Sequence, residues 1–492
     1  MTNSVVRLVD IQIQNFKNVK NGHLNLINRR KQFRASVLGL YGQNGSGKTA
    51  LIDALQMLKH ILSGQSVPDK FADYINVDEK MARLSFHFEM KDQQTGKCDI
   101  FYAFSMMSIE NDTEQNTAQV FEQKSKKKVQ IMDELLSISY EDAEGNRKIR
   151  KGPFIDTSSV SVFVPNSKYE LLFGKDRDVK QRLIVAKALA SATSRSFICS
   201  RERSTEMRKL QASVKQDGAE MSDERTFHSE IIERMVFYGN YELFVIGTSN
   251  TGIISLNALP LAFNVQHGEH GAVGNLMVPL GKTADIPEEV FRTVFEVVED
   301  MNIVLKQIVP GLTISVMDLG PTVTKSGAAG RRIMLMSDKN HKSIPLQYES
   351  EGIKKIISVL QLLIVMYNKP SITIAIDELD SGIFEYLLGE LLRILSEKGK
   401  GQLIFTSHNL RPLETLDRGF IAFTTTNPGN RYIRLTNIKE NNNLRDFYFR
   451  DIVLGEQREE VYNATNNAEI ALAFREAGEE VLSNVLSGGE RS

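Results

Sequence analysis

The sequence has few cysteines, no excess of charge of either sign and no long apolar run. Cys98 and Cys199 are too few for a disulfide framework, which excludes the small disulfide-stapled folds. Lys+Arg number 60 and Asp+Glu 61, so no overall positive field would draw the molecule onto a polyanion, and any contact with nucleic acid must be local. The longest apolar stretch, 356–367, is interrupted by Ser358 and Gln361 and falls short of the ~20 residues that a membrane span needs.

The first residues, MTNSVVRLVDIQIQNF, alternate apolar and polar side chains, which predicts a strand and not a signal peptide. With neither a signal segment nor a span, we expect a soluble protein of the cytoplasm that does not enter a membrane. A chain of 492 residues exceeds one compact core, so we expect two or more lobes.

The strongest motif is LGLYGQNGSGKTALIDALQML, residues 38–58. It reads as an apolar strand, then G-x-x-x-x-G-K-[ST], then apolar residues at helical spacing, which is the pattern of a phosphate-binding loop. Glycines let the backbone N–H groups approach the phosphates closely, and the lysine and threonine would contact phosphate oxygens and Mg²⁺. The predicted ATP-binding residues are Gly42, Gln43, Asn44, Gly45, Ser46, Gly47, Lys48 and Thr49, with Thr49 also predicted as a ligand of Mg²⁺.

Two later strands end in polar side chains that suit such a loop. PSITIAIDELDSG, residues 370–382, predicts a buried strand ending at Asp377 and Glu378. Asp377 suits a place in the second coordination shell of Mg²⁺. Glu378 suits the role of a general base that polarises the attacking water. GQLIFTSHNL, residues 401–410, predicts a further strand ending at His408, which could sense the γ-phosphate.

A third element would complete an ATP site of this kind: a serine and a glycine at a helix start. They would contact the γ-phosphate of a nucleotide held by a second subunit. LSGGERS, residues 486–492, matches the usual string but follows the last predicted core strand and is followed by too few residues to open a helix, so we expect a solvated tail. LQYESEGIKKIISVLQLLIVM, residues 346–366, is the better candidate. Ser350 and Gly352 there precede a run of apolar residues at helical spacing that leads to the strand of Asp377.

The order of these motifs resembles the ATP-binding-cassette ATPases of the SMC and RecF type, and more narrowly the AAA-labelled ATPases of bacterial phage-defence operons, such as the OLD proteins and the ATPase subunit of PARIS systems. The opening IQIQNFKNVKNGHLNL is similar to the first strand of that family. The resemblance implies that residues 42–49 bind ATP, that Asp377 and Glu378 serve Mg²⁺ and catalysis, and that His408 is a switch histidine. The family's sensing glutamine stays open among Gln93, Gln94 and Gln123.

The resemblance also implies a fold class and a division of the chain. We expect an α/β protein, a P-loop NTPase head of ABC/SMC type with an antiparallel β subdomain and an inserted helical region. The expected lobes are residues 1–165 with the phosphate loop and β subdomain, 166–250 as the helical insertion, and 251–492 with the S-x-G helix, Asp377 and His408. No sustained heptad is present, which excludes a long SMC arm, and a helical lid and a docking arm are equally compatible with the insertion.

Several shorter segments receive their own predictions. Residues 82–122 read as alternating strands, including TAQVFEQ. SKKKVQ and GNRKIRKG are basic runs of the kind usually found in solvated loops. HGEHGAVGN, 267–275, reads as a glycine-rich loop and not a metal site, and SGAAGRR reads as a turn between two strands.

Two functions are compatible with these features. The first is a phage-defence ATPase that forms an oligomer, at least a head-to-tail dimer, holds a separate toxic effector from the same operon, such as a nuclease, and releases it when a phage protein triggers it. The second is an SMC-like or RecF-like ATPase that clamps duplex DNA, with Arg29, Arg30, Lys31, Arg34 and the two basic runs as contacts. We expect no nuclease activity in this chain, because no acidic D-x-D arrangement follows His408.

Overall fold

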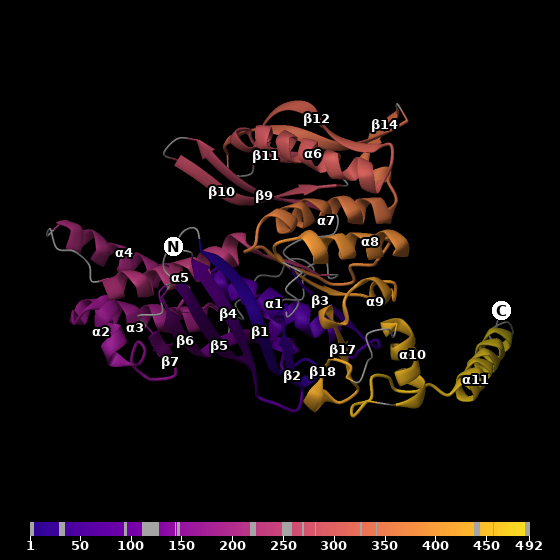
Figure 1. Ribbon diagram of the computed structural model, residues 1–492, viewed down its shortest axis with the longest axis horizontal. Helices are drawn as coiled ribbons and strands as arrows, with labels where there is room; N and C mark the ends of the chain where they lie inside the picture. The colour runs from indigo at the N-terminus through magenta and orange to yellow at the C-terminus, as the bar shows by residue number, and fades with distance from the viewer. Residues whose placement is uncertain are drawn as a thin grey trace.

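The computed structural model describes residues 4–28, 35–92, 96–110, 127–142, 144, 148–216, 223–247, 258–267, 270–280, 282–324, 327–340, 342–436, 443–455 and 457–487. The described elements lie around one central sheet. An antiparallel sheet with the helices that follow it lies on one side, and a smaller β unit lies at one end (Figure 1). Several sequence segments singled out above lie outside the described residues. They are TAQVFEQ, Gln93, Gln94, Gln123, Arg29, Arg30, Lys31, Arg34 and Gly488 to Ser492.

The central sheet has the strand order β18-β17-β3-β16-β15-β8, in which β3, β16, β15, β17 and β8 pair in parallel. Its strands are β3 (Ser36–Tyr41), β8 (Leu243–Ile246), β15 (Thr373–Ile376), β16 (Gln402–Thr406), β17 (Ile421–Thr424) and β18 (Tyr432–Ile433). Every residue of the five parallel strands is buried, because both faces of the sheet are covered. The two faces belong to two separate apolar cores, with Ala375 in one and Ile374 and Ile376 in the other.

One face of this sheet is covered by helix α1 (Lys48–Leu62) and then by an antiparallel sheet. All residues of α1 except Thr49 are buried, since the helix lies between the two sheets. The antiparallel sheet has the order β2-β1-β4-β5-β6-β7. Its strands are β1 (Val5–Phe16), β2 (Val19–Asn25), β4 (Met81–Asp92), β5 (Gly96–Glu110), β6 (Lys127–Glu141) and β7 (Lys148–Asp156).

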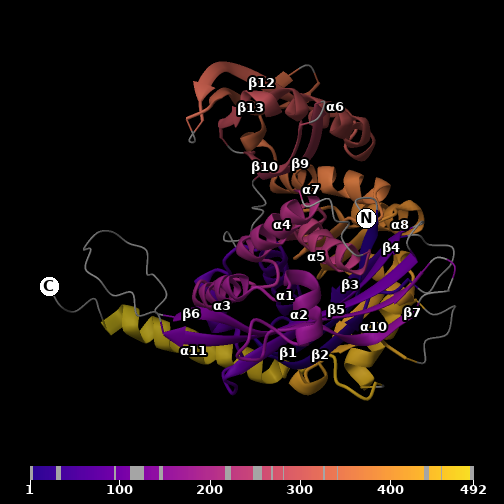
Figure 2. The same cartoon turned by 90° about the vertical axis from the view of Figure 1, so that its left-hand side faces the viewer.

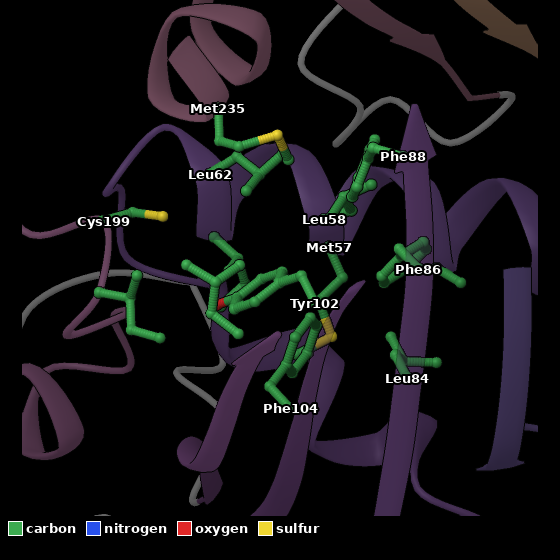
Figure 3. Packing of buried hydrophobic residues seen from close by; sticks show 14 of the residues in the cluster. Met57, Leu58, Leu62, Leu84, Phe86, Phe88, Tyr102, Phe104, Cys199 and Met235 are labelled. Atoms are coloured by element: carbon green, nitrogen blue, oxygen red, sulfur yellow. The ribbon is translucent and has the colours of Figure 1, made fainter. Parts of the chain in front are cut away.

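Period-two alternation fixes which face of the antiparallel sheet is buried. In β4 the buried positions are every second residue, and Leu84, Phe86 and Phe88 point toward Met57, Leu58 and other residues of α1 (Figure 3). The predicted β subdomain is therefore present. The basic runs at 125–130 and 145–152 were predicted as loops, and this prediction is wrong: their described residues belong to β6 and β7, paired in register with neighbouring strands.

Four helices follow the antiparallel sheet in sequence, and they precede β8 of the central sheet. They are α2 (Asn166–Phe173), α3 (Arg177–Ala192), α4 (Arg201–Gln216) and α5 (Asp223–Tyr241). Glu233 of α5 accepts hydrogen bonds from Arg203 and Ser204, which ties α4 to α5. The chain then enters β8 at the edge of the central sheet, so the helices form an excursion between two of its strands.

A further β unit lies at one end of the molecule, beyond α7 and α8 (Figures 1 and 2). It contains β9 (Ala258–His267), β10 (His270–Pro279), β11 (Ala284–Pro287), α6 (Glu288–Ile308), β12 (Leu312–Val323), β13 (Ala329–Lys339) and β14 (Lys342–Pro345). The turn predicted at SGAAGRR is confirmed between β12 and β13. HGEHGAVGN was predicted as a loop and is instead part of a hairpin, because His270 starts β10 and pairs with His267.

The last helices are α7 (Glu351–Asn368), α8 (Glu385–Lys398), α9 (Pro412–Thr415), α10 (Leu444–Leu454) and α11 (Asn467–Ser487). Of these, α7 to α10 contribute residues to the apolar core on the second face of the central sheet. α11 stands apart from the rest in Figure 1, and residues 467–478 are all exposed. Among the described residues, no helix combines the length and the apolar character that crossing a membrane requires.

Candidate functional site

The phosphate loop connects β3 to α1 in a conformation that requires glycine. Gly42 and Gly47 have φ values of 149° and 97°, in the region that residues with a β-carbon rarely adopt. A β-carbon on Gly42 would lie 1.8 Å from Thr424 Oγ1. Gly47 is the N-cap of α1, so the free N–H groups of the first helical turn face the loop. This is the cradle that a phosphate group fits.

Lys48 extends back over the loop that precedes it. Its Nζ donates to the carbonyl oxygens of Gly42 and Gln43 at 2.8 and 3.0 Å. Burial lowers the pKa of Lys48, while the nearby carboxylates of Asp377, Glu378 and Asp380 act in the opposite direction. The lysine is thus a cation held between a concave loop and three acids, which suits it to neutralise a bound polyanion.

The two acids predicted at the end of β15 are held there by Thr406 at the end of β16. The Thr406 hydroxyl donates to Asp377 Oδ1 at 2.6 Å and accepts from the Glu378 N–H at 2.7 Å. Asp377 is 1% exposed. Glu378 has a φ of 47°, a left-handed conformation that disfavours a residue with a side chain by about 1–2 kcal/mol. The chain therefore turns sharply at Glu378, directly after the Asp377 carboxylate that Thr406 holds.

His408 follows the same strand, and its backbone is fixed by Asp380. One carboxylate oxygen of Asp380 accepts from the N–H groups of His408 and Asn409 at 3.1 and 2.9 Å. The loop after Asp377 and the loop after Thr406 are therefore cross-linked by hydrogen bonds at two places. His408 stays exposed at the surface of the cleft described next.

These elements open onto one cleft of about 490 Å³, here called the phosphate-loop cleft. It brings the loop, both acids and the histidine together across more than three hundred residues of sequence. The lining residues are Lys17, Asn18, Asn44, Gly45, Gly47, Lys48, Thr49, Ala50, Asp377, Glu378, Thr406 and His408. The Thr49 hydroxyl and the Asp377 carboxylate share this cleft, and oxygen ligands of this kind are those that Mg²⁺ prefers.

Five of the predicted site residues do not line the phosphate-loop cleft: Gly42, Gln43, Ser46, Ser350 and Gly352. Gln43 turns its side chain toward the C-terminal segment, where Oε1 accepts from the Asn463 N–H at 2.9 Å. Ser46 donates to the Gln43 carbonyl oxygen at 2.5 Å. Ser350 and Gly352 also lie outside the lining. Within one chain the structure thus gathers most of the predicted site but not the S-x-G pair.

Ser350 and Gly352 nevertheless form the predicted helix start. Ser350 is the N-cap of α7, and its hydroxyl accepts from the Ile353 N–H at 3.4 Å. Gly352 packs against the loop that follows the acids, since a β-carbon on it would lie 2.0 Å from the Gly382 carbonyl oxygen. Glycine is needed at 352 for this approach of two backbones.

Several residues of the site were not predicted. Lys17 and Asn18 line the phosphate-loop cleft from the turn between β1 and β2, where Lys17 pairs with Asp53 and the Asn18 amide contacts the Gly45 carbonyl. Tyr432 donates from its hydroxyl to the Gly47 carbonyl oxygen at 2.9 Å. The sequence signal for the first two was the Asn15-Phe16-Lys17 turn, whereas nothing local in sequence marks Tyr432.

Within the described ranges, no group of three or more His, Cys, Asp or Glu side chains is placed to hold a metal ion. The phosphate-loop cleft itself offers the side-chain oxygens of Thr49, Asp377 and Glu378.

Part of the chain is similar to a known protein family. Residues 10–232 match the family described as "AAA domain". No curated protein sequence matches. Among solved structures, the SMC head bound to the C-winged helix domain of ScpA is 10% identical, with a TM-score of 0.35 over 87% of this chain and 97% of that one.

Two further SMC heads give similar values. The Smc head domain with an extended coiled coil from Pyrococcus furiosus, bound to the C-terminal domain of ScpA, is 12% identical, with a TM-score of 0.36 over 87% of this chain and 96% of that one. The SMC head domain from Thermotoga maritima is 13% identical, with a TM-score of 0.33 over 87% and 99%. The fold assignment itself rests on the sheet order and on the phosphate loop. The predicted fold class is confirmed: the chain is an α/β P-loop NTPase head with an antiparallel β subdomain and inserted helices, and its residues 10–232 match the AAA domain family.

Proposed function

We propose that this chain binds ATP in the phosphate-loop cleft and hydrolyses it with the help of Mg²⁺. The observation that carries the proposal is the convergence of the phosphate loop, Asp377, Glu378 and His408 on one cleft. Each of these groups has a role in phosphoryl transfer that its position supports. The cleft is open enough for a nucleotide and for the water that attacks it.

The roles follow from chemistry and position. The N–H groups at the start of α1 and the Lys48 ammonium would hold the β- and γ-phosphates. Mg²⁺, bound by the Thr49 hydroxyl and steadied by Asp377, would neutralise the charge that develops on the phosphate oxygens. Glu378 would polarise the attacking water as general base, and His408 would contact the γ-phosphate and respond to its loss.

The direct test is phosphate release by the purified chain and two variants. The Lys48→Ala variant is expected to lose ATP binding, and Glu378→Gln is expected to bind ATP and stall before hydrolysis. ATP binding by Lys48→Ala at the wild-type affinity would contradict the assignment of the loop. Hydrolysis by Glu378→Gln at the wild-type rate would mean that the general base lies elsewhere.

We further propose that two copies assemble head to tail, so that Ser350 and Gly352 of one copy complete the site of the other. The support is that this pair caps α7 yet does not line the phosphate-loop cleft of its own chain. A helix N-terminus is suited to contact the γ-phosphate, but here it would have to come from a second molecule.

Mixing two inactive variants tests the shared site. The Lys48→Ala variant lacks a working loop, and Ser350→Arg lacks a working helix start, so each alone should be inactive. In a head-to-tail pair made of one of each, the loop of the Ser350→Arg copy meets the intact helix start of the Lys48→Ala copy. Random pairing should then restore about a quarter of the wild-type rate, since half of the pairs are mixed and each holds one complete site of two. A mixture no more active than its components would contradict the shared site.

For the biological role we propose a sensor ATPase of phage defence that holds a separate effector and releases it on a phage trigger. This step rests on the family resemblance of the motifs. It is supported by an exposed apolar strip on α3 that suits a protein partner, with Ile184, Val185 and Leu189 at 40, 66 and 49% exposure.

A pull-down of tagged Glu378→Gln with ATP, from a host that carries the neighbouring genes, tests this role. A stoichiometric protein partner would support it. Duplex DNA without such a partner, with affinity that falls steeply as salt rises, would favour the DNA clamp instead.

A further inference from the structure

Lys355 is a buried cation in the second turn of α7, close to the catalytic loop. Its side chain is 4% exposed, and its Nζ donates to the carbonyl oxygen of Glu378 at 3.2 Å. Burial lowers its pKa to about 8, although Asp380, Glu378 and Asp377 favour its charged form. Removing an ammonium group from water is unfavourable unless it gains partners, so this placement calls for an explanation.

The partner of Lys355 is a backbone held in an unusual conformation. Glu378 has a positive φ of 47°, and each of its two backbone polar groups is held by a side chain. Thr406, at the end of β16, accepts from its N–H, and Lys355, from α7, donates to its C=O. A left-handed conformation of this kind persists only where the surroundings impose it. The Glu378 C=O also accepts from the Ser381 N–H at 3.1 Å within the same loop. The two side-chain contacts add restraints from two elements that are far apart in sequence.

A second contact joins the same helix to the same loop. Gly352, in the first turn of α7, lies against Gly382, four residues after Glu378. The contact is close enough that a β-carbon on Gly352 would lie 2.0 Å from the Gly382 carbonyl oxygen. The helix that begins at Ser350 therefore touches the catalytic loop at its first turn through Gly352 and at its second through Lys355.

We propose that Lys355 is a positioning residue that sets the backbone of Glu378 from α7, so that the Ser350 helix start and the general base move together. The inference rests on the proposed ATPase function. The inference adds a physical link within one chain. The link joins the helix start at Ser350, which a second copy would contact, to Glu378, the general base in the chain's own cleft. A shift of α7 on engagement would be transmitted to the Glu378 carbonyl through the ammonium group.

The chain offers a matched control for this lysine. Lys59 of α1 is also buried, at 6% exposure, and burial likewise lowers its pKa to about 8. Its Nζ donates to the carbonyl oxygens of Gly239 and Leu243 at 3.0 and 2.6 Å. It thus resembles Lys355 in burial and in hydrogen bonding to backbone carbonyls, but its partners lie at the end of α5 and the start of β8.

The experiment compares Lys355→Met with Lys59→Met in the full-length chain. Methionine keeps the length of the stem and removes the donor. Lys355→Met is expected to lower kcat by about 10- to 100-fold, since small displacements of a catalytic group have effects of this size, while ATP affinity changes little. Lys59→Met is expected to lower the melting temperature and leave kcat within about twofold of the wild type. Lys355→Arg, which keeps a charged donor, should recover most of the rate.

Three results separate this inference from the proposed function. A wild-type chain without ATPase activity overturns the proposed function, and the inference with it. An active wild type whose kcat is unchanged in Lys355→Met overturns the inference alone, as does an equal loss of kcat in Lys59→Met. Should Lys355→Met unfold at the assay temperature, Lys355→Gln carries the same expectation, because its amide is one atom too short to reach the Glu378 carbonyl.

Discussion

Replacing Thr406 by valine tests how the two acids are held. Valine has nearly the shape of threonine, but it removes the hydroxyl that donates to Asp377 Oδ1 at 2.6 Å and accepts from the Glu378 N–H at 2.7 Å. Thr406 is 0% exposed at the edge of the phosphate-loop cleft, and valine would place an apolar methyl group where both partners now meet a hydroxyl. Both partners would lose a hydrogen bond at once.

The expected magnitude follows from the two lost bonds. Leaving buried partners unsatisfied lowers the free energy of unfolding by about 1–3 kcal/mol for each group, so for the two groups we expect a loss of about 2–6 kcal/mol in total. The larger effect should be on turnover. With Asp377 no longer held by Thr406 and the turn at Glu378 less constrained, kcat should fall by about 10- to 100-fold, while the phosphate loop still binds the nucleotide.

Thr373 at the other end of β15 provides the matched control. It is also fully buried, and it makes two side-chain hydrogen bonds, with Gln402 Oε1 at 3.1 Å and with the Tyr238 hydroxyl at 2.8 Å. Thr373→Val should therefore destabilise the chain by a similar amount in urea denaturation without lowering kcat. Phosphate-release kinetics and ATP titrations of both variants give the answer. An equal loss of kcat in the two variants, or none in either, would refute the reasoning.

Three further predictions concern the same cleft. Gly42→Ala should weaken ATP binding by about 10-fold or more, roughly 1.4 kcal/mol, because its β-carbon would meet Thr424 Oγ1; binding of a fluorescent ATP analogue at the wild-type affinity would contradict this. Asp380→Ala should lower kcat more than ATP affinity, because the N–H groups of His408 and Asn409 lose their acceptor, and an unchanged kcat would exclude that role. Chelation of Mg²⁺ with EDTA should abolish phosphate release and added Mg²⁺ should restore it, so hydrolysis that persists in EDTA would exclude metal assistance through Thr49 and Asp377.

Some of the fold was predictable because it depends on neighbours in sequence. The apolar runs at 38–41, 372–376 and 402–405 predicted buried strands, and they are β3, β15 and β16 of the parallel sheet. The serine at 350 predicted a helix start, and Ser350 is the N-cap of α7. The same local reasoning failed at GNRKIRKG. Its charges indicated a loop, whereas its described residues, 148–152, pair with β6 as part of a strand, since an edge strand tolerates lysine and arginine on its exposed side.

The division of the chain at 165 and 250 stays a prediction, as do the roles of all the predicted site residues, from Gly42 to Thr49 and at Ser350, Gly352, Asp377, Glu378 and His408. In the described residues α2 to α5 fall within the predicted helical segment, and β8 follows them as part of the central sheet. The β unit of β9 to β14 with α6 had no counterpart in the sequence reasoning beyond the turn at SGAAGRR. Its strands carry no motif, and their pairing places β9 and β10 in one sheet and β11 to β14 in another.

The sequence by itself determined the phosphate loop, the strand that ends in Asp377 and Glu378, and the helix start at Ser350. Each of these is a contiguous segment whose backbone conformation and hydrogen bonds are set by nearby residues. Only the tertiary structure decided that Thr406 bridges the two acids, that Lys355 holds the carbonyl of Glu378 and that Gly352 lies on Gly382. These contacts depend on which strands are neighbours in the central sheet and on how α7 packs beside it, and no local pattern specifies that order.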